Sequence, residues 1–327
     1  MGKRSSVATG NFCAFCPVFL AMKKFLRNFA DYAVYLLVRV VICVAQCLSL
    51  DVCRRGAELL AFLFTDVLKA RGRLLETNLS KAFPESTKAE RREEIRRMWT
   101  HLFLMAAEVA HAPRELHELN WWKSVKLENP YWMLNALMDD RPLILITGHF
   151  GNFEMGGYIL GLLGYPTFSV ARRLDNPYLN DFIGEFRGQT GQFLIDKNEG
   201  YEEILDVLRN KGTMAFLADQ SAGRKGAWID FFGRPASAFK APALLSVQYD
   251  APMLVCSATR NDDKPMHFTL KHIDCVDPRD LPEGMRTIQQ MTQWHASALE
   301  GEIRRQPDQY WWLHNRWKTY GRNFDKK

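Results

Sequence analysis

The 327-residue sequence lacks the short motifs that identify many cofactor-dependent and covalent enzymes. It has no P-loop, no G-x-S-x-G nucleophile elbow, and no G-x-G-x-x-G after a predicted strand. Low-complexity segments, convincing internal repeats and recognisable nucleic-acid-binding motifs are also absent. The chemistry that remains needs neither a bound nucleotide nor a serine nucleophile of this type, and we expect no nucleic-acid partner.

Metal-binding patterns are equally scarce. Cys13 and Cys16 form a C-x-x-C without a second pair, and this spacing alone does not predict a metal site. His149 and Glu154 are not spaced as a metal-binding pair on one helix face. We therefore expect no metal and no cofactor, and we interpret the seven cysteines as reduced thiols that face the cytoplasm.

Composition indicates a well-packed protein with an anionic partner. Hydrophobic residues make up 47% of the chain and aromatic residues 12%, enough for a full α/β domain and an appendage. Lysine and arginine number 43 against 37 acidic residues, a formal charge of +6. This moderate excess suits a membrane surface, an acidic carrier protein or a phosphorylated substrate.

Residues 22–70 predict hydrophobic helices that attach the protein to a membrane. The segment 33–50 carries one charge, at Arg39, and a basic cluster that includes Lys23 and Lys24 precedes it. Its 18 residues are borderline for a spanning helix, which needs about 20. A spanning helix and a helix in the interface therefore both stay open. We expect residues 1–21 to be a disordered tail or an over-extended start.

Strands that alternate with helices predict an α/β fold with a mostly parallel mixed sheet, flanked by helices, in a domain of residues 71–320. Residues 321–327 are expected to form a tail. Between the strand at 213–218 and a helix that starts at Ala243, residues 221–234 are expected to form a long loop. The predicted strands lie at residues 142–147, 167–170, 193–195, 213–218, 252–258 and 266–273.

The clearest candidate site follows the strand that starts at Pro142. His149 comes just after this apolar run, Asn152 can cap the next helix, and Glu154 lies in that helix's first turn. In open α/β sheets, ligands bind at this carboxyl edge. We interpret His149 as a general base whose tautomer Glu154 fixes. The alternative is an ordinary polar loop.

Two more predicted strands end in polar residues, which favours a shared site. Arg172 and Arg173 follow one strand and Asp219 follows another. Either arginine could hold an anionic group such as a phosphate, or face a developing oxyanion. A histidine base of this kind could deprotonate an alcohol for attack on an activated acyl group. Asp219 could support the site or bind this acceptor alcohol. Surface salt bridges for the arginines and a capping role for Asp219 are the alternatives.

At this point the chain resembles the bacterial family of late acyltransferases of lipid A biosynthesis, which also includes lysophospholipid acyltransferases. The resemblance covers about residues 26–320, and its closing aromatic and basic segment is the most specific part. The pieces that carry it are Thr147–Glu154, Arg172 with Asp175-Asn176-Pro177, Arg187, Asp219-Gln220, Phe231–Gly233 and Gln309–Thr319.

The resemblance implies an O-acyltransferase on the cytoplasmic face of the bacterial inner membrane. It implies transfer of a fatty acyl chain from an acyl carrier protein or CoA thioester to a hydroxyl of a lipid A precursor. His149 and Glu154 would be the catalytic pair. Arg172, in the family's arginine position, would bind substrate with Arg173, Asp219, Arg187 and Asn152.

Three alternatives stay open. A histidine followed by an acidic residue five positions later also fits glycerolipid acyltransferases of the lysophosphatidate type, which usually carry aspartate there. Related enzymes acylate other glycolipids, such as mannosylated phosphatidylinositols. A non-catalytic, membrane-associated lipid-binding protein of the same fold is the third. Within the closing segment, Trp311, Trp312 and Trp317 stand among cations, as in a membrane interface, but the alternation of Trp311, Leu313 and Trp317 also fits a core strand with one solvated face.

Overall fold

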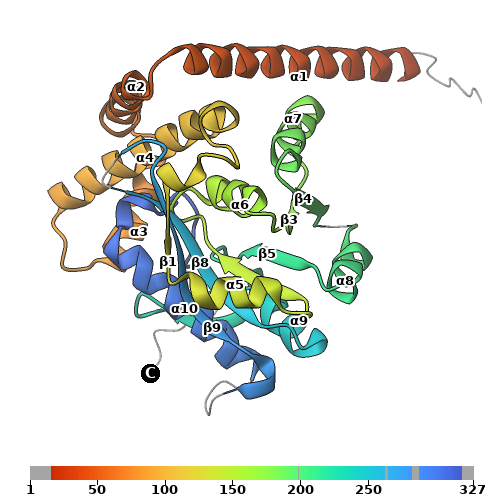
Figure 1. The fold of residues 1–327 in the computed structure, drawn as a ribbon. Coiled ribbons are helices and arrows are strands. Elements are labelled where there is room, and N and C mark those ends of the chain that lie inside the picture. The colour runs from red at the N-terminus through yellow and green to blue at the C-terminus, as the bar shows by residue number, and fades with distance from the viewer. Residues whose placement is uncertain (1–15, 198, 262–263, 282–286, 319–327) are drawn as a thin grey trace, which may run out of the picture.

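A computed structural model describes residues 16–197, 199–261, 264–281 and 287–318 (Figure 1). Within these residues, the main sheet has seven strands in the order β1-β9-β8-β2-β5-β3-β4. All neighbours run parallel except β8 and β9, which are antiparallel. This confirms the predicted α/β fold with a mostly parallel mixed sheet. The strands are β1 (Val125–Glu128), β2 (Leu143–Thr147), β3 (Thr167–Ala171), β4 (Gln192–Asp196), β5 (Thr213–Leu217), β8 (Met253–Arg260) and β9 (Phe268–Val276).

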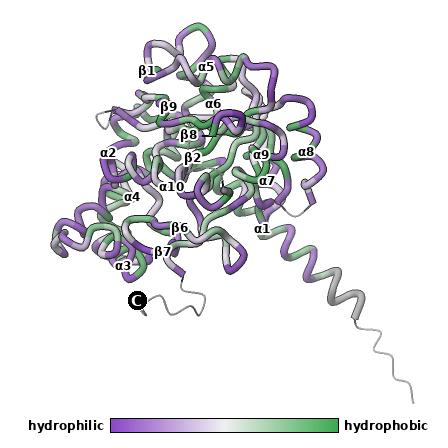
Figure 2. Tube along the Cα trace, turned by 90° about the horizontal axis from the view of Figure 1, so that it is seen from below, coloured by the Kyte–Doolittle hydropathy of each residue, from purple (hydrophilic) through white to green (hydrophobic). Residues whose placement is uncertain are grey.

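Helices cover both faces of the sheet, as the alternating burial of β2 requires. Leu145 packs in a cluster with α6, whereas its neighbours Ile144 and Ile146 pack with α8, α9 and α10 on the other face. Figure 2 shows the hydrophobic strands β2 and β8 near the middle of the molecule. The helices that follow the strands are α5 (Pro130–Met138), α6 (Phe153–Leu162), α7 (Pro177–Gly188), α8 (Tyr201–Arg209), α9 (Ala241–Tyr249) and α10 (Ile288–Arg305).

The N-terminal part of the described chain is helical. Helix α4 begins with a capping box between Thr87 and Glu90, in which each residue bonds the backbone of the other. The elements are α1 (Cys16–Cys47), α2 (Leu50–Phe62), the π-helix η1 (Leu63–Val67), α3 (Gly72–Ala82) and α4 (Lys88–Glu115). The 3-10 helices are η2 (Trp121–Lys123), η3 (Gly223–Lys225), η4 (Pro278–Asp280) and η5 (Pro307–Gln309).

Helix α1 lies across the domain and continues beyond it (Figure 1). A stripe at spacings of four and three residues, from Asp31 through Tyr35, Val38 and Ile42 to Gln46, is partly covered by the domain. The Asp31 carbonyl accepts a hydrogen bond from Asn176 at the start of α7, and Gln46 donates one to a carbonyl of α4. Residues Met22–Cys47 are long and apolar enough to cross a membrane.

The predicted long loop at residues 221–234 is wrong. Residues 227–231 and 234–238 form an antiparallel hairpin, β6 (Ala227–Phe231) and β7 (Arg234–Ala238). Ala227, Ile229 and Phe231 alternate inward, and the turn residues Phe232 and Gly233 have φ of 57° and 70°. Positive φ at both central residues is the geometry of a tight hairpin turn.

The closing segment packs into the core. Trp312 is 1% exposed and Trp317 is 7% exposed, in a cluster with the hairpin, α3, α4 and α10. Tyr310 forms an isolated bridge with Phe150 rather than part of a strand. A membrane-interface position is therefore wrong for these two buried tryptophans, and the segment instead fastens the loop that follows β2. Residues 1–15 and 319–327, which hold most of the predicted tails, lie outside the described chain.

Candidate active site

His149 lies two residues past the end of β2, at the carboxyl edge of the sheet. Its Nδ1 is 2.8 Å from Oδ1 of Asp219, which follows the neighbouring strand β5. The strands pair in a register that joins Thr147 to Leu217, so the same offset brings residues 149 and 219 side by side. Asp219 is 5% exposed, so this carboxylate is held away from water.

The structure corrects the role predicted for Glu154. Its carboxylate accepts a hydrogen bond of 2.8 Å from Nε of Arg187 on α7, and a second bond from the same guanidinium. Because Asp219 occupies Nδ1 of His149, the prediction that Glu154 fixes the tautomer is wrong. The place of Glu154 among the catalytic residues stays a prediction, although its charge does act on His149.

The charges of His149 and Asp219 shift the pKa of each other's side chain. Burial lowers the pKa of His149, but the charge and hydrogen bond of Asp219, and then the charge of Glu154, outweigh it and raise the pKa above its ordinary value. Burial raises the pKa of Asp219. The charge and hydrogen bonds of His149, and then the charge of Arg316, outweigh burial, so the pKa lies below its ordinary value. Asp219 therefore stays ionised beside the ring.

The second ring nitrogen of His149 contacts Gln220, and both residues line a cavity. With Nδ1–H donated to a carboxylate, Nε2 of the neutral ring is an acceptor. It is 3.3 Å from the side-chain nitrogen of Gln220. The rings of Phe153 and Trp311 contact the imidazole edge-to-face at 5.2 and 5.8 Å between centroids. The ring nitrogen that can accept a proton is therefore Nε2.

Two residues of the closing segment support Asp219 and the end of its strand, although neither was predicted to belong to the site. Tyr310 is buried and hydrogen-bonded to Asp219; burial, with the charge of Asp219, raises its pKa well above the ordinary value. His314 Nε2 accepts a hydrogen bond of 2.9 Å from the backbone of Ser221. Burial lowers the pKa of His314 to about 4, so the ring is a neutral acceptor.

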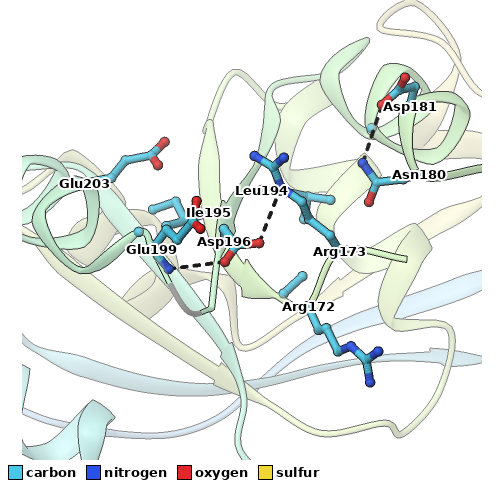
Figure 3. Close-up of a pocket in the computed structure, with 12 residues that line it drawn as sticks. Arg172, Arg173, Asn180, Asp181, Leu194, Ile195, Asp196, Glu199 and Glu203 are labelled. Carbon is cyan, nitrogen blue, oxygen red and sulfur yellow. Dashed lines mark hydrogen bonds and ion pairs between the residues drawn. The ribbon is translucent and has the colours of Figure 1, made fainter. Parts of the chain in front are cut away.

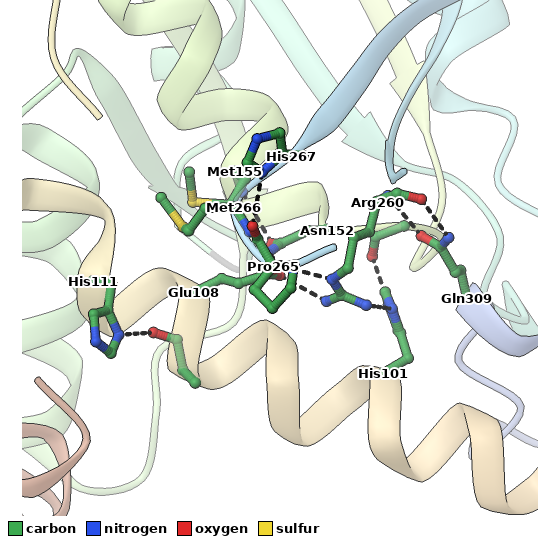
Figure 4. A network of polar contacts seen from close by, with 12 residues as sticks. His101, Glu108, His111, Asn152, Met155, Arg260, Pro265, Met266, His267 and Gln309 are labelled. Carbon is green, nitrogen blue, oxygen red and sulfur yellow. Dashed lines mark hydrogen bonds and ion pairs between the residues drawn. The ribbon is translucent and has the colours of Figure 1, made fainter. Parts of the chain in front are cut away.

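The loop that carries His149 is fixed by a buried polar network (Figure 4). Asn152 caps α6 through Met155 N, as predicted, and donates from Nδ2 to Glu108 on α4 at 2.9 Å. The same carboxylate receives two hydrogen bonds of 2.7 Å from Arg260 of β8, and both side chains are almost fully buried. Since Asn152 is occupied in this way, the structure places it in support of the loop; its predicted substrate contact is untested.

A second branch of the network holds the backbone of the loop. Arg260 donates to His101 Nδ1 at 2.9 Å, and His101 Nε2 donates to the carbonyl of Gly151 at 3.2 Å. Burial, and then the charge of Arg260, lower the pKa of His101 to about 3. Gly151 has φ of 63°, and its amide donates to the carbonyl of Gln309. The main chain just after His149 is thus held by residues of α4, β8 and η5.

Arg172 and Arg173 lie at the end of β3, beside the site rather than in contact with His149. Their side chains are 72% and 75% exposed and pair with Asp175 and Asp196. Figure 3 shows Arg173 directed to Asp196 and Arg172 pointing away from it. Both line an open polar cavity of about 670 Å³, and Arg172 also lines the apolar cavity at His149. Their binding of an anionic group stays a prediction.

An apolar cavity of about 730 Å³ opens at His149. Its polar lining includes Glu154, Arg187 and Gln220, and most of the remaining walls are aliphatic or aromatic. This size and composition suit a ligand that is mainly hydrocarbon and is held at one polar end. Among the described residues, no group of three or more His, Cys, Asp or Glu could hold a metal ion. The predicted absence of a metal and of a cofactor stays a prediction.

Known proteins resemble this chain over most of its length. It is 26% identical to the lipid A biosynthesis palmitoleoyltransferase of Escherichia coli K12, covering 77% of this chain and 80% of that protein. It is 22% identical to the lauroyltransferase of lipid A biosynthesis from the same strain, with the same coverage. A solved 1-acyl-sn-glycerophosphate acyltransferase from Thermotoga maritima aligns with a TM-score of 0.37 and 14% identity, over 81% of this chain and 99% of that one.

The family described as bacterial lipid A biosynthesis acyltransferases matches residues 21–319. The match spans the N-terminal helices, the site at the carboxyl edge of the sheet and the closing segment. It confirms the resemblance drawn from the sequence motifs. The chain therefore belongs to the bacterial lipid A biosynthesis acyltransferase family.

Proposed function

We propose that the protein transfers a fatty acyl chain from an acyl thioester to a hydroxyl group of a lipid A precursor. One observation carries the proposal. His149 is hydrogen-bonded through Nδ1 to buried Asp219 at 2.8 Å, and it lines an apolar cavity of about 730 Å³. An oriented base beside a hydrocarbon-sized cavity suits transfer of an acyl chain to an alcohol. Membership of the family supports lipid A as the acceptor.

In the proposed mechanism, Nε2 of His149 takes the proton of the acceptor hydroxyl as its oxygen attacks the thioester carbonyl. A carbon–oxygen bond forms and a tetrahedral oxyanion results. When the carbon–sulfur bond breaks, the leaving thiolate takes the proton back from Nε2. Asp219 stabilises the imidazolium formed between these two steps, which is where its negative charge contributes most.

The predicted substrate-binding arginines have distinct places in this scheme. Arg187 is paired with Glu154 in the wall of the cavity, so it fixes that carboxylate close to His149. Arg172 and Arg173 lie farther out and are largely exposed. We assign these two to an anionic group on a substrate, such as a phosphate of the acceptor or of the thioester carrier.

The same proposal places the protein on the cytoplasmic face of the bacterial inner membrane, with acyl carrier protein or CoA as the thioester carrier. Large apolar side chains of α1 are exposed, among them Phe29, Leu37 and Val41. One stripe of α1 is partly covered by the domain while these residues face outward, so we assign α1 to the interface rather than to a separate span. Extraction of membranes with alkaline carbonate tests this: release supports an interfacial helix, and retention supports a spanning one.

Purified protein with an acyl-carrier-protein thioester and a lipid A precursor tests the activity. We expect a product heavier by one acyl chain and loss of this product in His149→Ala, with His117→Ala, at an exposed histidine, as the matched control. Acylation of lysophosphatidate instead of the lipid A precursor would refute the proposed acceptor. Transfer at the wild-type rate by His149→Ala would refute the proposed base.

A further inference from the structure

The cavity at His149 reaches both faces of the sheet. On β2 it is lined by Leu145 and Ile146, whose side chains point to opposite faces. The helices agree with this alternation, because α6 lines the cavity on one face and α8 and α9 line it on the other. We call these two parts the α6 lobe and the α9 lobe.

The pairing of the strands explains how one cavity can cross the sheet. Strands β3 and β5 pair only as far as Ser169 and Ala215. Beyond that point β5 still pairs with β2, and β3 with β4, to the ends of the strands. The sheet is therefore open between β3 and β5 at its carboxyl edge. His149 follows β2 at the same carboxyl edge and lines the cavity.

Buried residues line the inner end of the α6 lobe. Its walls include Leu160, Thr167, Cys256 and Leu270, each of which is at most 8% exposed. Gly157 lines it too, and a Cβ there would lie 2.3 Å from the side chain of Gln192. A buried apolar end of this kind fits a hydrocarbon chain of limited length and excludes a longer one.

The α9 lobe is bounded by side chains that reach the surface. Leu244 of α9 is 48% exposed and Tyr201 of α8 is 61% exposed, and both line the cavity. Phe239 and Pro242, just before and within the first turn of α9, complete an apolar wall. A chain held here can continue outward past Leu244 and Tyr201, while the buried side chains of Ile146 and Leu245 line the inner part of the lobe.

We propose that the two lobes hold two hydrocarbon chains at once, the acyl chain of the donor in the α6 lobe and a chain of the lipid acceptor in the α9 lobe. This inference rests on the proposed function, in which both substrates carry hydrocarbon. The α6 lobe selects the chain that is transferred. The α9 lobe holds a chain whose remaining part stays with the acceptor's lipid. His149 lies where the two chains come together.

Substitutions that fill one lobe at a time test this assignment. Ala215→Leu and Ser169→Leu each extend a side chain into the α6 lobe. If one of these variants does not fold, the other is used for the test. Leu244→Trp narrows the α9 lobe, and Val247→Trp is its control, since Val247 is 52% exposed on the same helix and does not line the cavity. Each full-length protein is given a mixture of acyl-carrier-protein thioesters of graded length and a lipid A precursor.

We expect the α6-lobe variants to change the ratio of short to long transferred chains by about tenfold or more, because a pocket discriminates single methylenes to this degree. We expect Leu244→Trp to raise KM for the acceptor without changing that ratio, and Val247→Trp to match the wild type. A shift of chain length in Leu244→Trp equal to that in Ala215→Leu would overturn the assignment, since one chain would then fill both lobes. Unchanged chain length in both α6-lobe variants would also overturn it.

Failure of the proposed function gives a result that differs from failure of the two-lobe assignment. If the wild type acylates no lipid A precursor, the reaction is wrong, and the lobes are then tested by binding of a fluorescent fatty acid. Two bound chains in the wild type, with one lost in Ala215→Leu and one in Leu244→Trp, would support the two lobes. A single bound chain in the wild type would refute them.

Discussion

Replacing Asp219 with asparagine tests the pairing on which the proposed mechanism depends. The substitution keeps the size of the side chain and one oxygen, but it removes the negative charge beside His149. The carboxylate and the imidazole are 2.8 Å apart, and Asp219 is 5% exposed. Water therefore cannot replace the lost charge without a change in the surrounding packing.

The magnitude follows from the geometry. Two unit charges at the 2.8 Å separation interact by about 6 kcal/mol at an effective dielectric constant of about 20, which is an upper limit because burial of both groups opposes it. Measured hydrogen bonds to charged groups contribute about 1.5–3 kcal/mol net. At about 1.4 kcal/mol per factor of ten, this is a loss of about 10- to 150-fold in kcat. A ring that also adopts the wrong tautomer loses more, so we expect a total of about 10²- to 10³-fold.

The pH profile supplies a second, independent readout. His149 acts as a base only when it is deprotonated, so activity rises with pH through its pKa. Asp219 raises that pKa by its charge and its hydrogen bond, against burial. In Asp219→Asn the pKa therefore falls, and the acidic limb of the kcat profile moves to lower pH while the plateau is reduced. A purely structural defect would lower the plateau and leave the limb in place.

Initial rates of acyl transfer in detergent micelles, measured across pH, check both expectations. Asp140→Asn is the control, because Asp140 pairs with a lysine on the surface and its side chain is 88% exposed. Glu154→Gln is the decisive comparison, since the sequence predicted that Glu154 orients the ring. A larger loss in Glu154→Gln than in Asp219→Asn, or a wild-type kcat in Asp219→Asn, would refute the reasoning.

Three further substitutions test the supports of the site. Gly151→Ala places a Cβ 2.2 Å from a backbone carbonyl oxygen of β8, so it should lower Tm strongly. Gly164 also has a positive φ, 86°, but the space around it is open, so Gly164→Ala should lower Tm far less. Similar decreases of Tm in the two variants would contradict the clash. Glu108→Gln leaves the buried guanidinium of Arg260 without its charged partner, and it should reduce the free energy of unfolding measured in urea by about 3–5 kcal/mol. The control Arg279→Ala, at an exposed arginine, should reduce this free energy by about 1 kcal/mol or less. Equal losses in the two variants would count against the network. Tyr310→Phe removes the hydrogen bond to the site carboxylate, worth about 1 kcal/mol, and should lower kcat about fivefold with Tm nearly unchanged; an unaltered kcat would show that this hydroxyl does not act on the site.

Local patterns in the sequence predicted the elements of the site but not their neighbours. The apolar run before His149 predicted β2, and Asn152 was expected to cap α6, as it does. Three strand ends were expected to meet at one edge, and β2, β5 and β3 are adjacent in the sheet. The hairpin at residues 227–238 was missed because Phe232 takes a positive φ that its residue type does not favour.

The buried network was beyond the reach of the sequence for a different reason. Glu108 and Arg260 are 152 positions apart, and the polar residues of α4 lay in a pattern that predicted only packing. Their pairing depends on α4 crossing the end of β8, which is a tertiary relation. No local pattern distinguishes a buried glutamate from the exposed ones in the same helix. The side chain that supports the loop is therefore visible only once the fold is known.

The pairing of His149 follows from strand order, which is why the nearer glutamate in the sequence was the wrong partner. Glu154 is five positions away along the chain, but it lies in the first turn of α6, where α7 offers Arg187 to its carboxylate. Asp219 is 70 positions away, yet it follows the strand next to β2 in a register that continues to residue 149. Two strands, β3 and β4, intervene along the chain between β2 and β5, and both lie on the far side of β5 in the sheet. That order also places the open edge between β3 and β5 next to His149, so one feature of the topology sets both the partner of the base and the course of the cavity.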